Sequence, residues 1–196
     1  MKHLPNSLTI ARILLTPVFL MFILVDTFLA QLLALGVFIL AAVSDWLDGL
    51  VARRFDADSE LGRYLDPFAD KVLVLSAFVV LPFLLPSVVP WWAVIVIAVR
   101  DIIITGLRIF ASYRNRPLRT LPLAKTKTAS QLTFLIVVIG LLVVRRAPDA
   151  KGLNRFASDA LESNFVYLFL LVVVVLTAVT GIMYFLRQPA NEPVST

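Results

Sequence analysis

Residues 165–186 read FVYLFLLVVVVLTAVTGIMYFL, a run of 22 residues that contains no charged side chain. A helix needs about 20 apolar residues to cross the hydrocarbon core of a bilayer. A strand of a membrane β-barrel would instead alternate apolar and polar residues, and this run does not alternate. The run therefore predicts a transmembrane helix.

The whole chain shares the apolar character of this run. Of its 196 residues, 60% are hydrophobic and 16% are charged, whereas charged residues make up about 25% of ordinary globular chains. The mean hydropathy is +0.91. This composition excludes a soluble domain and a disordered chain, and it indicates an integral membrane protein.

Five further segments approach the length of a membrane span. Because backbone polar groups in lipid must be satisfied internally, we expect an all-α integral membrane protein with six transmembrane helices in a single domain, residues 1–196. The expected spans are about 6–26, 28–52, 62–85, 90–111, 123–144 and 165–186. We expect residues 147–163 to form an interfacial helix outside the membrane. We do not expect the first span to be a cleavable signal peptide, because its apolar stretch is long and no small-residue cleavage site is obvious.

Basic residues in the connections predict the orientation of these spans. An even number of spans places both termini on one side, where the connections 53–63 and 112–122 are rich in arginine. The last connection on the opposite side is an exception, because it holds a mixture of charges: Arg145, Arg146, Lys151, Arg155, Asp149, Asp159 and Glu162. The balance predicts cytoplasmic termini. The net charge of +5 is explained by basic residues that set the topology and contact anionic lipid headgroups. We expect no nucleic-acid partner.

The chain has no cysteine, and its one histidine is His3. The missing cysteines exclude a disulfide framework, a Cys-ligated metal site and a cysteine nucleophile. A single histidine argues against a His-clustered metal site and a Ser-His-Asp triad. Catalysis would then depend on carboxylates, lysines, arginines and a bound ion.

Four aspartates interrupt the apolar segments on either side of the connection between the second and third spans: Asp45, Asp48, Asp66 and Asp70. The first two are three residues apart and the last two are four apart, so each pair shares a helical face. Antiparallel neighbours can bring the four together near the membrane surface, where a cation such as Mg²⁺, Mn²⁺ or Ca²⁺ would offset their repulsion. The alternative is pairing with neighbouring basic residues: Arg53, Arg54, Arg63 and Lys71.

These aspartates belong to a longer pattern, Asp45-x2-Asp48-Gly49-x2-Ala52-Arg53-x8-Gly62-x3-Asp66-x3-Asp70. The pattern resembles the signature of the CDP-alcohol phosphotransferase family. That resemblance implies a six-helix membrane enzyme that transfers a phosphatidyl or similar group from a CDP-linked donor to an alcohol and releases CMP. It further implies that the four aspartates ligate two divalent ions, Mg²⁺ or Mn²⁺, at the donor's pyrophosphate and that Asp70 is the general base.

The resemblance also implies a set of residues close to the nucleotide of the donor. These residues are Asp48, Gly49, Ala52, Arg53 and Gly62. Asn6 and Thr9 at the start of the first span are further candidates for contact with the pyrophosphate or cytidine. The alternative for Asn6 is a helix N-cap, and the alternative for Gly49 and Ala52 is helix packing by small residues.

The chemistry of the transfer fits these residue types independently of the resemblance. Phosphoryl transfer needs neutralised charge on the phosphate oxygens and an acceptor hydroxyl in line with the leaving group. Two cations can stabilise both the attacking and the leaving oxygens, and a carboxylate not fully used by metal can accept the proton of the alcohol. No covalent enzyme intermediate is required.

Four further stretches resemble bacterial phosphatidylglycerophosphate synthases, a group within that family. They are residues 5–12 (PNSLTIAR), Arg100-Asp101, Leu107-Arg108 and residues 125–131 (KTKTASQ). The resemblance implies CDP-diacylglycerol as the donor, sn-glycerol 3-phosphate as the acceptor, a homodimer, and a multi-pass location in the bacterial inner membrane with the active site facing the cytoplasm. Ala124 departs from the family, which usually has glycine at that position.

A phosphorylated acceptor needs a cationic pocket in addition to the metal site. The candidates are Arg100, Arg108, Arg119, Lys125 and Lys127. Each has an alternative: the two lysines are also topology signals, Arg100 is also a partner for Asp101, and Arg108 is able to snorkel to headgroups.

Two classes of rival function stay open at this point. The first is the same chemistry with another acceptor, such as inositol phosphate, serine or phosphatidylglycerol. The second is a divalent-cation transporter. A transporter is expected to hold its acids near the bilayer midplane in repeated, broken helices, whereas these acids lie toward one surface and the chain has no visible repeat.

Overall fold

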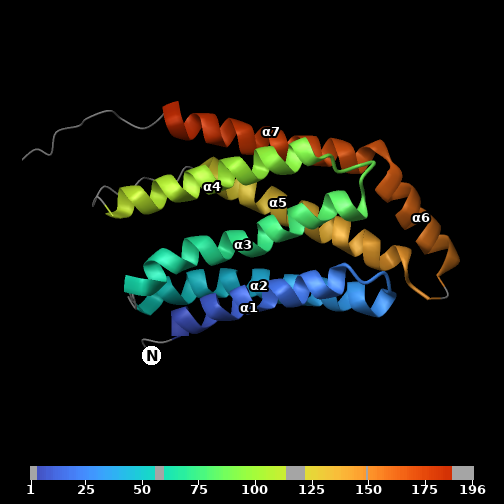
Figure 1. The fold of residues 1–196 in the computed structure, drawn as a ribbon, viewed down its shortest axis with the longest axis horizontal. Coiled ribbons are helices and arrows are strands. Elements are labelled where there is room, and N and C mark those ends of the chain that lie inside the picture. The colour runs from blue at the N-terminus through green and yellow to red at the C-terminus, as the bar shows by residue number, and fades with distance from the viewer. Residues whose placement is uncertain (1–3, 56–59, 114–121, 149, 187–196) are drawn as a thin grey trace, which may run out of the picture.

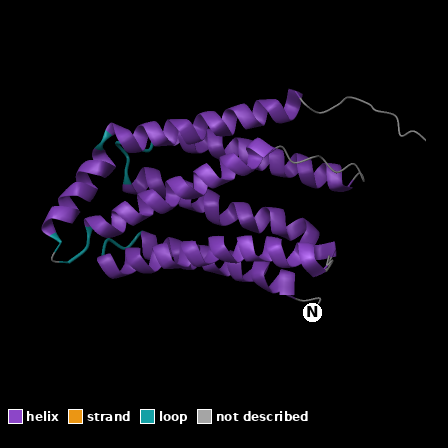
Figure 2. Cartoon of the chain, turned by 180° about the vertical axis from the view of Figure 1, so that it is seen from behind, coloured by secondary structure: helices purple, strands orange, loops and turns teal. Residues whose placement is uncertain are grey.

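The computed structural model describes residues 4–55, 60–113, 122–148 and 150–186. Within these ranges the chain forms seven α-helices and no strand (Figures 1 and 2), so the all-α prediction is confirmed. The helices are α1 (Leu4–Ile23), α2 (Phe28–Phe55), α3 (Glu60–Leu84), α4 (Trp91–Tyr113), α5 (Pro122–Arg145), α6 (Lys151–Glu162) and α7 (Asn164–Leu186).

Each of the six expected spans corresponds to one long helix, and the ends differ by a few residues. Proline explains several of these ends, because it cannot donate a backbone hydrogen bond and disfavours helix in the residue before it. Pro86 and Pro90 flank the turn between α3 and α4, and Pro122 is the first residue of α5. The short helix α6 forms within the segment 147–163, where an additional helix was expected.

Two stretches of the described residues are long and apolar enough to cross a membrane. They are Lys125–Arg145 on α5 and Asn164–Tyr184 on α7. Shorter apolar stretches occur on three other helices, at Arg12–Ile23, Phe28–Ser44 and Lys71–Leu84. These apolar helices are consistent with a membrane protein.

The long helices lie side by side as an elongated bundle, and α6 crosses one end of it (Figure 1). Helix α1 packs against both α2 and α3, and α4 packs against α3 and α7. Helix α5 occupies the middle, because it contacts α2, α3, α6 and α7. The end opposite α6 gathers the end of α2, the start of α3 and the ends of α4 and α7 (Figure 1).

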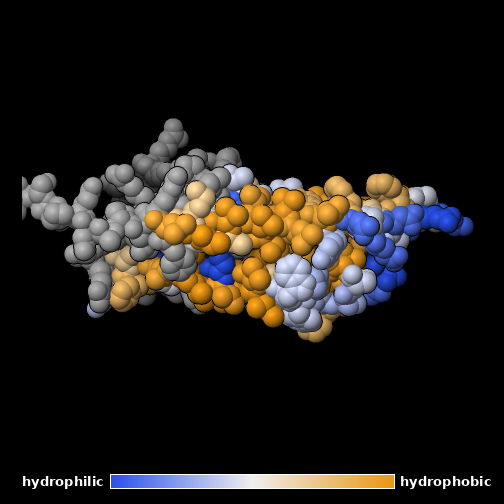
Figure 3. Space-filling model, turned by 90° about the horizontal axis from the view of Figure 1, so that it is seen from above, coloured by the Kyte–Doolittle hydropathy of each residue, from blue (hydrophilic) through white to orange (hydrophobic). Residues whose placement is uncertain are grey.

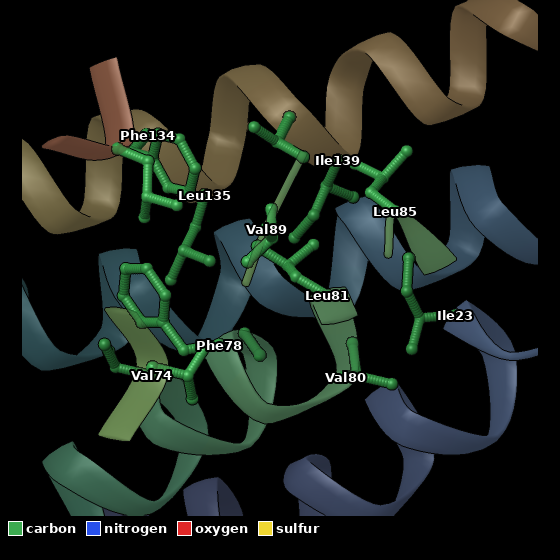
Figure 4. Close-up of a cluster of buried hydrophobic side chains, with 14 of the residues drawn as sticks. Ile23, Val74, Phe78, Val80, Leu81, Leu85, Val89, Phe134, Leu135 and Ile139 are labelled. Carbon is green, nitrogen blue, oxygen red and sulfur yellow. The ribbon is translucent and has the colours of Figure 1, made fainter. Parts of the chain in front are cut away.

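The interior is an apolar cluster centred on α3 and α5 (Figure 4). Phe78 of α3 stacks on Phe134 of α5 with ring centroids 5.8 Å apart. Phe134 also meets the edge of Phe169 of α7 at 5.3 Å. Leu81 and Ile139 fill the neighbouring layer from the same two helices. The cluster thus fixes α3, α5 and α7 relative to one another.

The face of the bundle shown in Figure 3 is apolar along much of its described length. Large hydrophobic side chains such as Leu14, Met21, Leu40 and Ile182 are exposed. Soluble monomers rarely expose contiguous apolar surface of this extent, whereas lipid chains cover it naturally. Hydrophilic side chains gather at the end that carries α6 (Figure 3).

Candidate functional site

The fold places the four aspartates at matching depths on two antiparallel helices. Asp45 lies ten residues before the end of α2, and Asp70 lies ten residues after the start of α3. Asp48 lies seven residues before the end of α2, and Asp66 lies six residues after the start of α3. With a rise of about 1.5 Å per residue, Asp45 and Asp70 each lie about 15 Å along the helix from these joined ends, and Asp48 and Asp66 lie about 10 Å from them. Figure 1 shows that α2 and α3 run in opposite directions.

The short connection between these helices limits the separation of their ends. Residues 56–59 join them, and five Cα–Cα steps extend at most about 18 Å. The contacts of the four carboxylates lie outside the described side chains, so their role as metal ligands stays a prediction. Elsewhere in the described part of the chain, no group of three or more acidic or histidine side chains gathers to hold a metal ion.

The predicted donor-binding residues lie on three helices at one end of the bundle. Gly49, Ala52 and Arg53 lie in the last two turns of α2, and Gly62 lies in the first turn of α3. Because α1 packs against both helices, its first turns, with Asn6 and Thr9, belong to the same end of the bundle (Figure 1).

The N-cap alternative for Asn6 is wrong. Helix α1 begins at Leu4, so Asn6 lies inside the first turn. An N-cap residue would instead directly precede the helix. The backbone N–H groups in the first turn of a helix have no intrahelical acceptor. The position is compatible with a contact to an anionic group.

Two of the predicted acceptor-binding residues, Arg100 and Lys127, contact one buried acid, Asp101 on α4. Its side chain has a relative exposure of 0%. Lys127 on α5 is 1% exposed, and its ammonium donates to both carboxylate oxygens of Asp101. Gln131 Nε2, one turn further along α5, donates to Asp101 Oδ2 at 3.5 Å. Arg100 Nη1 donates to Asp101 Oδ1 at 3.1 Å.

Arg100 extends this network from α4 to α7. Its Nη2 donates to Thr180 Oγ1 at 3.0 Å. The arginine passes directly over Gly181, where an added Cβ would lie 3.1 Å from Arg100 Cγ. A groove of about 390 Å³ between the two helices reaches Arg100 and is otherwise lined by apolar and small residues. Gly181 therefore makes room for the arginine.

This network bears directly on two of the predicted acceptor-binding residues. The charged groups of Arg100 and Lys127 are both engaged by Asp101, and the Arg100–Asp101 pair is the alternative considered from the sequence. Lys125 lies in the first turn of α5 and is exposed, whereas Arg119 lies outside the described residues. The backbone at Ala124 is helical, because α5 begins at Pro122.

The network carries an excess of positive charge. Arg100 and Lys127 contribute two positive charges and Asp101 contributes one negative charge. The network therefore has a net positive charge.

Arg108 lies nearer the end of α4 and contacts the last turns of α7. Its guanidinium carbon is 5.6 Å from the centroid of the Tyr184 ring, in a cation–π contact. Snorkelling toward headgroups was the alternative for Arg108, and its predicted role in binding the acceptor's phosphate stays a prediction. Tyr184 is 5% exposed, so the contact is shielded from solvent.

Four participants in this region were not identified as site residues from the sequence: Asp101, Gln131, Thr180 and Tyr184. Gln131 was noted only as part of the stretch 125–131. Asp101 was considered only as a partner for Arg100, although an acid inside an apolar segment is itself a functional signal. Thr180 and Tyr184 gave no signal, because threonine and tyrosine are ordinary residues of a membrane helix. Only the packing of α7 against α4 brings them to the arginines.

Comparisons with known proteins agree with the sequence pattern. A family model described as CDP-alcohol phosphatidyltransferase matches residues 2–183. A Rickettsia bellii protein named CDP-diacylglycerol–glycerol-3-phosphate 3-phosphatidyltransferase is 34% identical over 94% of each chain. A Bacillus subtilis protein with the same name is 32% identical over 96% of each chain. A third with that name, from Pseudomonas fluorescens, is 34% identical over 70% of this chain and 72% of its own.

Proposed function

The chain belongs to the CDP-alcohol phosphatidyltransferase family, and we propose that it transfers the phosphatidyl group of CDP-diacylglycerol to sn-glycerol 3-phosphate. The products are phosphatidylglycerophosphate and CMP. The observation that carries the proposal is the likeness, over almost the whole chain, to relatives that are named for this reaction.

We assign the donor's pyrophosphate to the end of α2 and the start of α3. Asp45, Asp48, Asp66 and Asp70 supply the hard oxygen donors that Mg²⁺ and Mn²⁺ prefer, at matching depths on two antiparallel helices. Two such ions, when bound, would neutralise the charge of the phosphate oxygens. Members of this family are generally dependent on a divalent metal.

The transfer itself is a direct displacement on the donor's β-phosphorus. The primary hydroxyl oxygen of the acceptor forms the new P–O bond, and the bond between that phosphorus and the bridging oxygen of CMP breaks. Asp70 accepts the hydroxyl proton, and CMP leaves with the electron pair. Gly49, Ala52 and Arg53 on α2, with Gly62 on α3 and Asn6 and Thr9 on α1, are proposed to line the nucleotide.

The acceptor's phosphate is proposed to bind at the ends of α4 and α5. Lys125 is exposed there and Arg108 is held by Tyr184, so these two are the proposed direct contacts, with Arg119 as a further candidate. Arg100 and Lys127 are engaged by Asp101, and we infer that they attract the anion by their charge.

An apolar groove offers a place for the donor's acyl chains. The groove has a volume of about 590 Å³ and runs between α1 and α3, along Leu20, Leu24, Val72, Leu75 and Phe83. Val72 lies two residues beyond Asp70 on α3. A lipid whose headgroup is held by the four aspartates would therefore find its chains beside this groove.

We further propose six membrane spans in the bacterial inner membrane, formed by α1 to α5 and α7. Both termini and the active site would face the cytoplasm, because the arginine-rich connections lie at that end. The active form is proposed to be a homodimer.

The test is CMP release by purified protein in detergent with CDP-diacylglycerol and Mg²⁺ or Mn²⁺. We expect release with glycerol 3-phosphate and not with inositol 1-phosphate, serine or phosphatidylglycerol. EDTA should abolish it, and added metal should restore it. Release with another of these acceptors would overturn the proposed acceptor, and release in EDTA would overturn the metal site.

A further inference from the structure

Tyr184 places a phenol hydroxyl in a buried, cationic part of the molecule. The residue lies two positions before the end of α7 and is 5% exposed. Its ring lies beneath the guanidinium of Arg108, 5.6 Å from ring centroid to guanidinium carbon. The ring therefore fixes the arginine, and the hydroxyl is available for another interaction.

Two hydrogen-bond donors of this pair are buried without a partner. Among the described residues, neither Tyr184 Oη nor Arg108 Nε has a hydrogen-bond partner. Buried polar groups in native proteins are almost always paired, because an unpaired donor loses its hydration and gains nothing in return. Two unpaired donors on contacting side chains indicate a ligand with acceptor oxygens.

The charges nearby indicate that this ligand is an anion. Arg100, Lys127 and Arg108 contribute three positive charges on α4 and α5, against the single negative charge of Asp101. Arginine next to a hydroxyl donor is a common arrangement for phosphate, which accepts several charge-assisted hydrogen bonds. Tyr184 lies two residues before the end of α7 and Arg108 lies five residues before the end of α4. Both helices end at the end of the bundle where α2 ends and α3 begins (Figure 1).

We propose that the Tyr184 hydroxyl, together with Arg108, binds the phosphate group of the acceptor. This inference rests on the proposed function. Tyr184 is a binding residue, and its ring and hydroxyl have separate tasks: the ring orients Arg108, and the hydroxyl donates to a phosphate oxygen.

The variant Tyr184→Phe tests this division, because it keeps the ring and removes only the hydroxyl. We expect the KM for glycerol 3-phosphate to rise about 10-fold, as is typical when a hydrogen bond to a charged group is lost. The KM for CDP-diacylglycerol and kcat should change less than about twofold. The matched control is Tyr167→Phe, a half-buried tyrosine near the other end of α7, which should leave both KM values unchanged.

Binding is measured in parallel, as the rise in unfolding temperature that glycerol 3-phosphate causes, so that turnover is not the only readout. We expect a rise for the wild type and for Tyr167→Phe, and a smaller rise for Tyr184→Phe. Equal KM values and equal rises in wild type and Tyr184→Phe would overturn the inference. A raised KM for CDP-diacylglycerol alone would also overturn it, because the phosphate would then belong to the donor lipid.

The failure of the proposed function looks different in this experiment. In that case the wild type releases no CMP with glycerol 3-phosphate, whatever residue occupies position 184. If glycerol 3-phosphate still raises the unfolding temperature of the wild type more than that of Tyr184→Phe, the phosphate site stands and only the reaction is reassigned.

Discussion

Asp101 joins three hydrogen-bond donors to one carboxylate in a region from which solvent is excluded. Lys127 and Gln131 reach it from α5, and Arg100 reaches it from its own helix. A buried charge is costly unless it is paired and hydrogen-bonded. At the scale of the residue, Asp101 is therefore the group that allows two cations to remain inside the bundle.

Replacing Asp101 with asparagine should destabilise the protein strongly. Lys127 and Arg100 would lose their counter-charge, and breaking a buried pair in this way costs about 3–5 kcal/mol. The free energy of unfolding in mixed micelles measures the effect. The control is Asp159→Asn on the exposed face of α6, with an expected change within about 0.5 kcal/mol.

The double variant Asp101→Leu/Lys127→Met distinguishes a charge effect from a packing effect. Apolar residues of similar size often replace a buried pair with little loss of stability. We expect the double variant to be more stable than Asp101→Asn. A double variant that is less stable than Asp101→Asn would show that the pair itself, and not an unpaired charge, stabilises the fold.

Residues differ in how well the sequence predicts their part in the site. The four aspartates stand out because charges inside apolar segments are rare, and their spacing alone predicts a shared face. Lys127 and Lys125 look equivalent in the sequence, yet Lys127 is buried against Asp101 and Lys125 is exposed. That difference depends on which face of α5 meets α4, and no local pattern contains this information.

At the scale of elements, α4 and α7 make contact through a glycine. Gly181 on α7 leaves space for Arg100 of α4 to reach Thr180, which neighbours the glycine on α7. A side chain at this position would displace the arginine and separate the two helices. Small residues at helix contacts in membranes allow this kind of close approach.

The variant Gly181→Val should weaken the contact between α4 and α7. Overpacking of this type costs about 1–3 kcal/mol, measured again as the free energy of unfolding. The matched control is Gly36→Val on α2, because a Cβ at Gly36 meets no atom within 4 Å. Both variants change helix propensity in the same way, and only Gly181→Val adds a clash with Arg100. Equal losses of unfolding free energy in the two variants would therefore show that the clash has no effect.

Phe134 joins three helices, because its ring contacts Phe78 on α3 and Phe169 on α7. The variant Phe134→Ala should lower the free energy of unfolding by about 3–5 kcal/mol, through lost contacts and a cavity. Phe156→Ala on α6 is the control, because Phe156 is 64% exposed and leaves no buried cavity. A similar loss in both variants would argue against the central role of α5.

The long helices were predictable because each is an apolar run with a proline or a charged residue near its end. Their pairing was not predictable from the same information. Helices that are apolar on nearly all sides give no preferred face, so the sequence could not indicate that α5 lies in the middle or that α4 meets α7. The ends of the helices differ from expectation where α2 and α3 extend toward each other, at Phe55 and Glu60.

In the whole molecule, the four predicted metal ligands and the basic network lie on different helices. The four aspartates lie on α2 and α3, and the network around Asp101 lies on α4, α5 and α7. A donor held on α2 and α3 and an acceptor held on α4 and α5 would meet between them, at the end of the bundle opposite α6 (Figure 1).

The proposed topology predicts that the two ends of the bundle face opposite sides of the membrane. The chain has no cysteine, so single cysteines can be labelled without background. Tyr113→Cys at the end of α4 and Lys151→Cys at the start of α6 are both at exposed positions. In intact spheroplasts an impermeant maleimide should label position 151 only, and position 113 should react after lysis. Labelling of both before lysis would contradict six spans.

The most direct test of the central claim follows the acceptor into the product. Purified protein is incubated with CDP-diacylglycerol, metal and radiolabelled glycerol 3-phosphate, and both CMP and lipid-phase label are counted. We expect equal amounts of CMP and labelled phosphatidylglycerophosphate, and loss of both by at least about 100-fold in a folded Asp70→Asn variant. CMP that forms without label in the lipid, or full activity in Asp70→Asn, would contradict the claim.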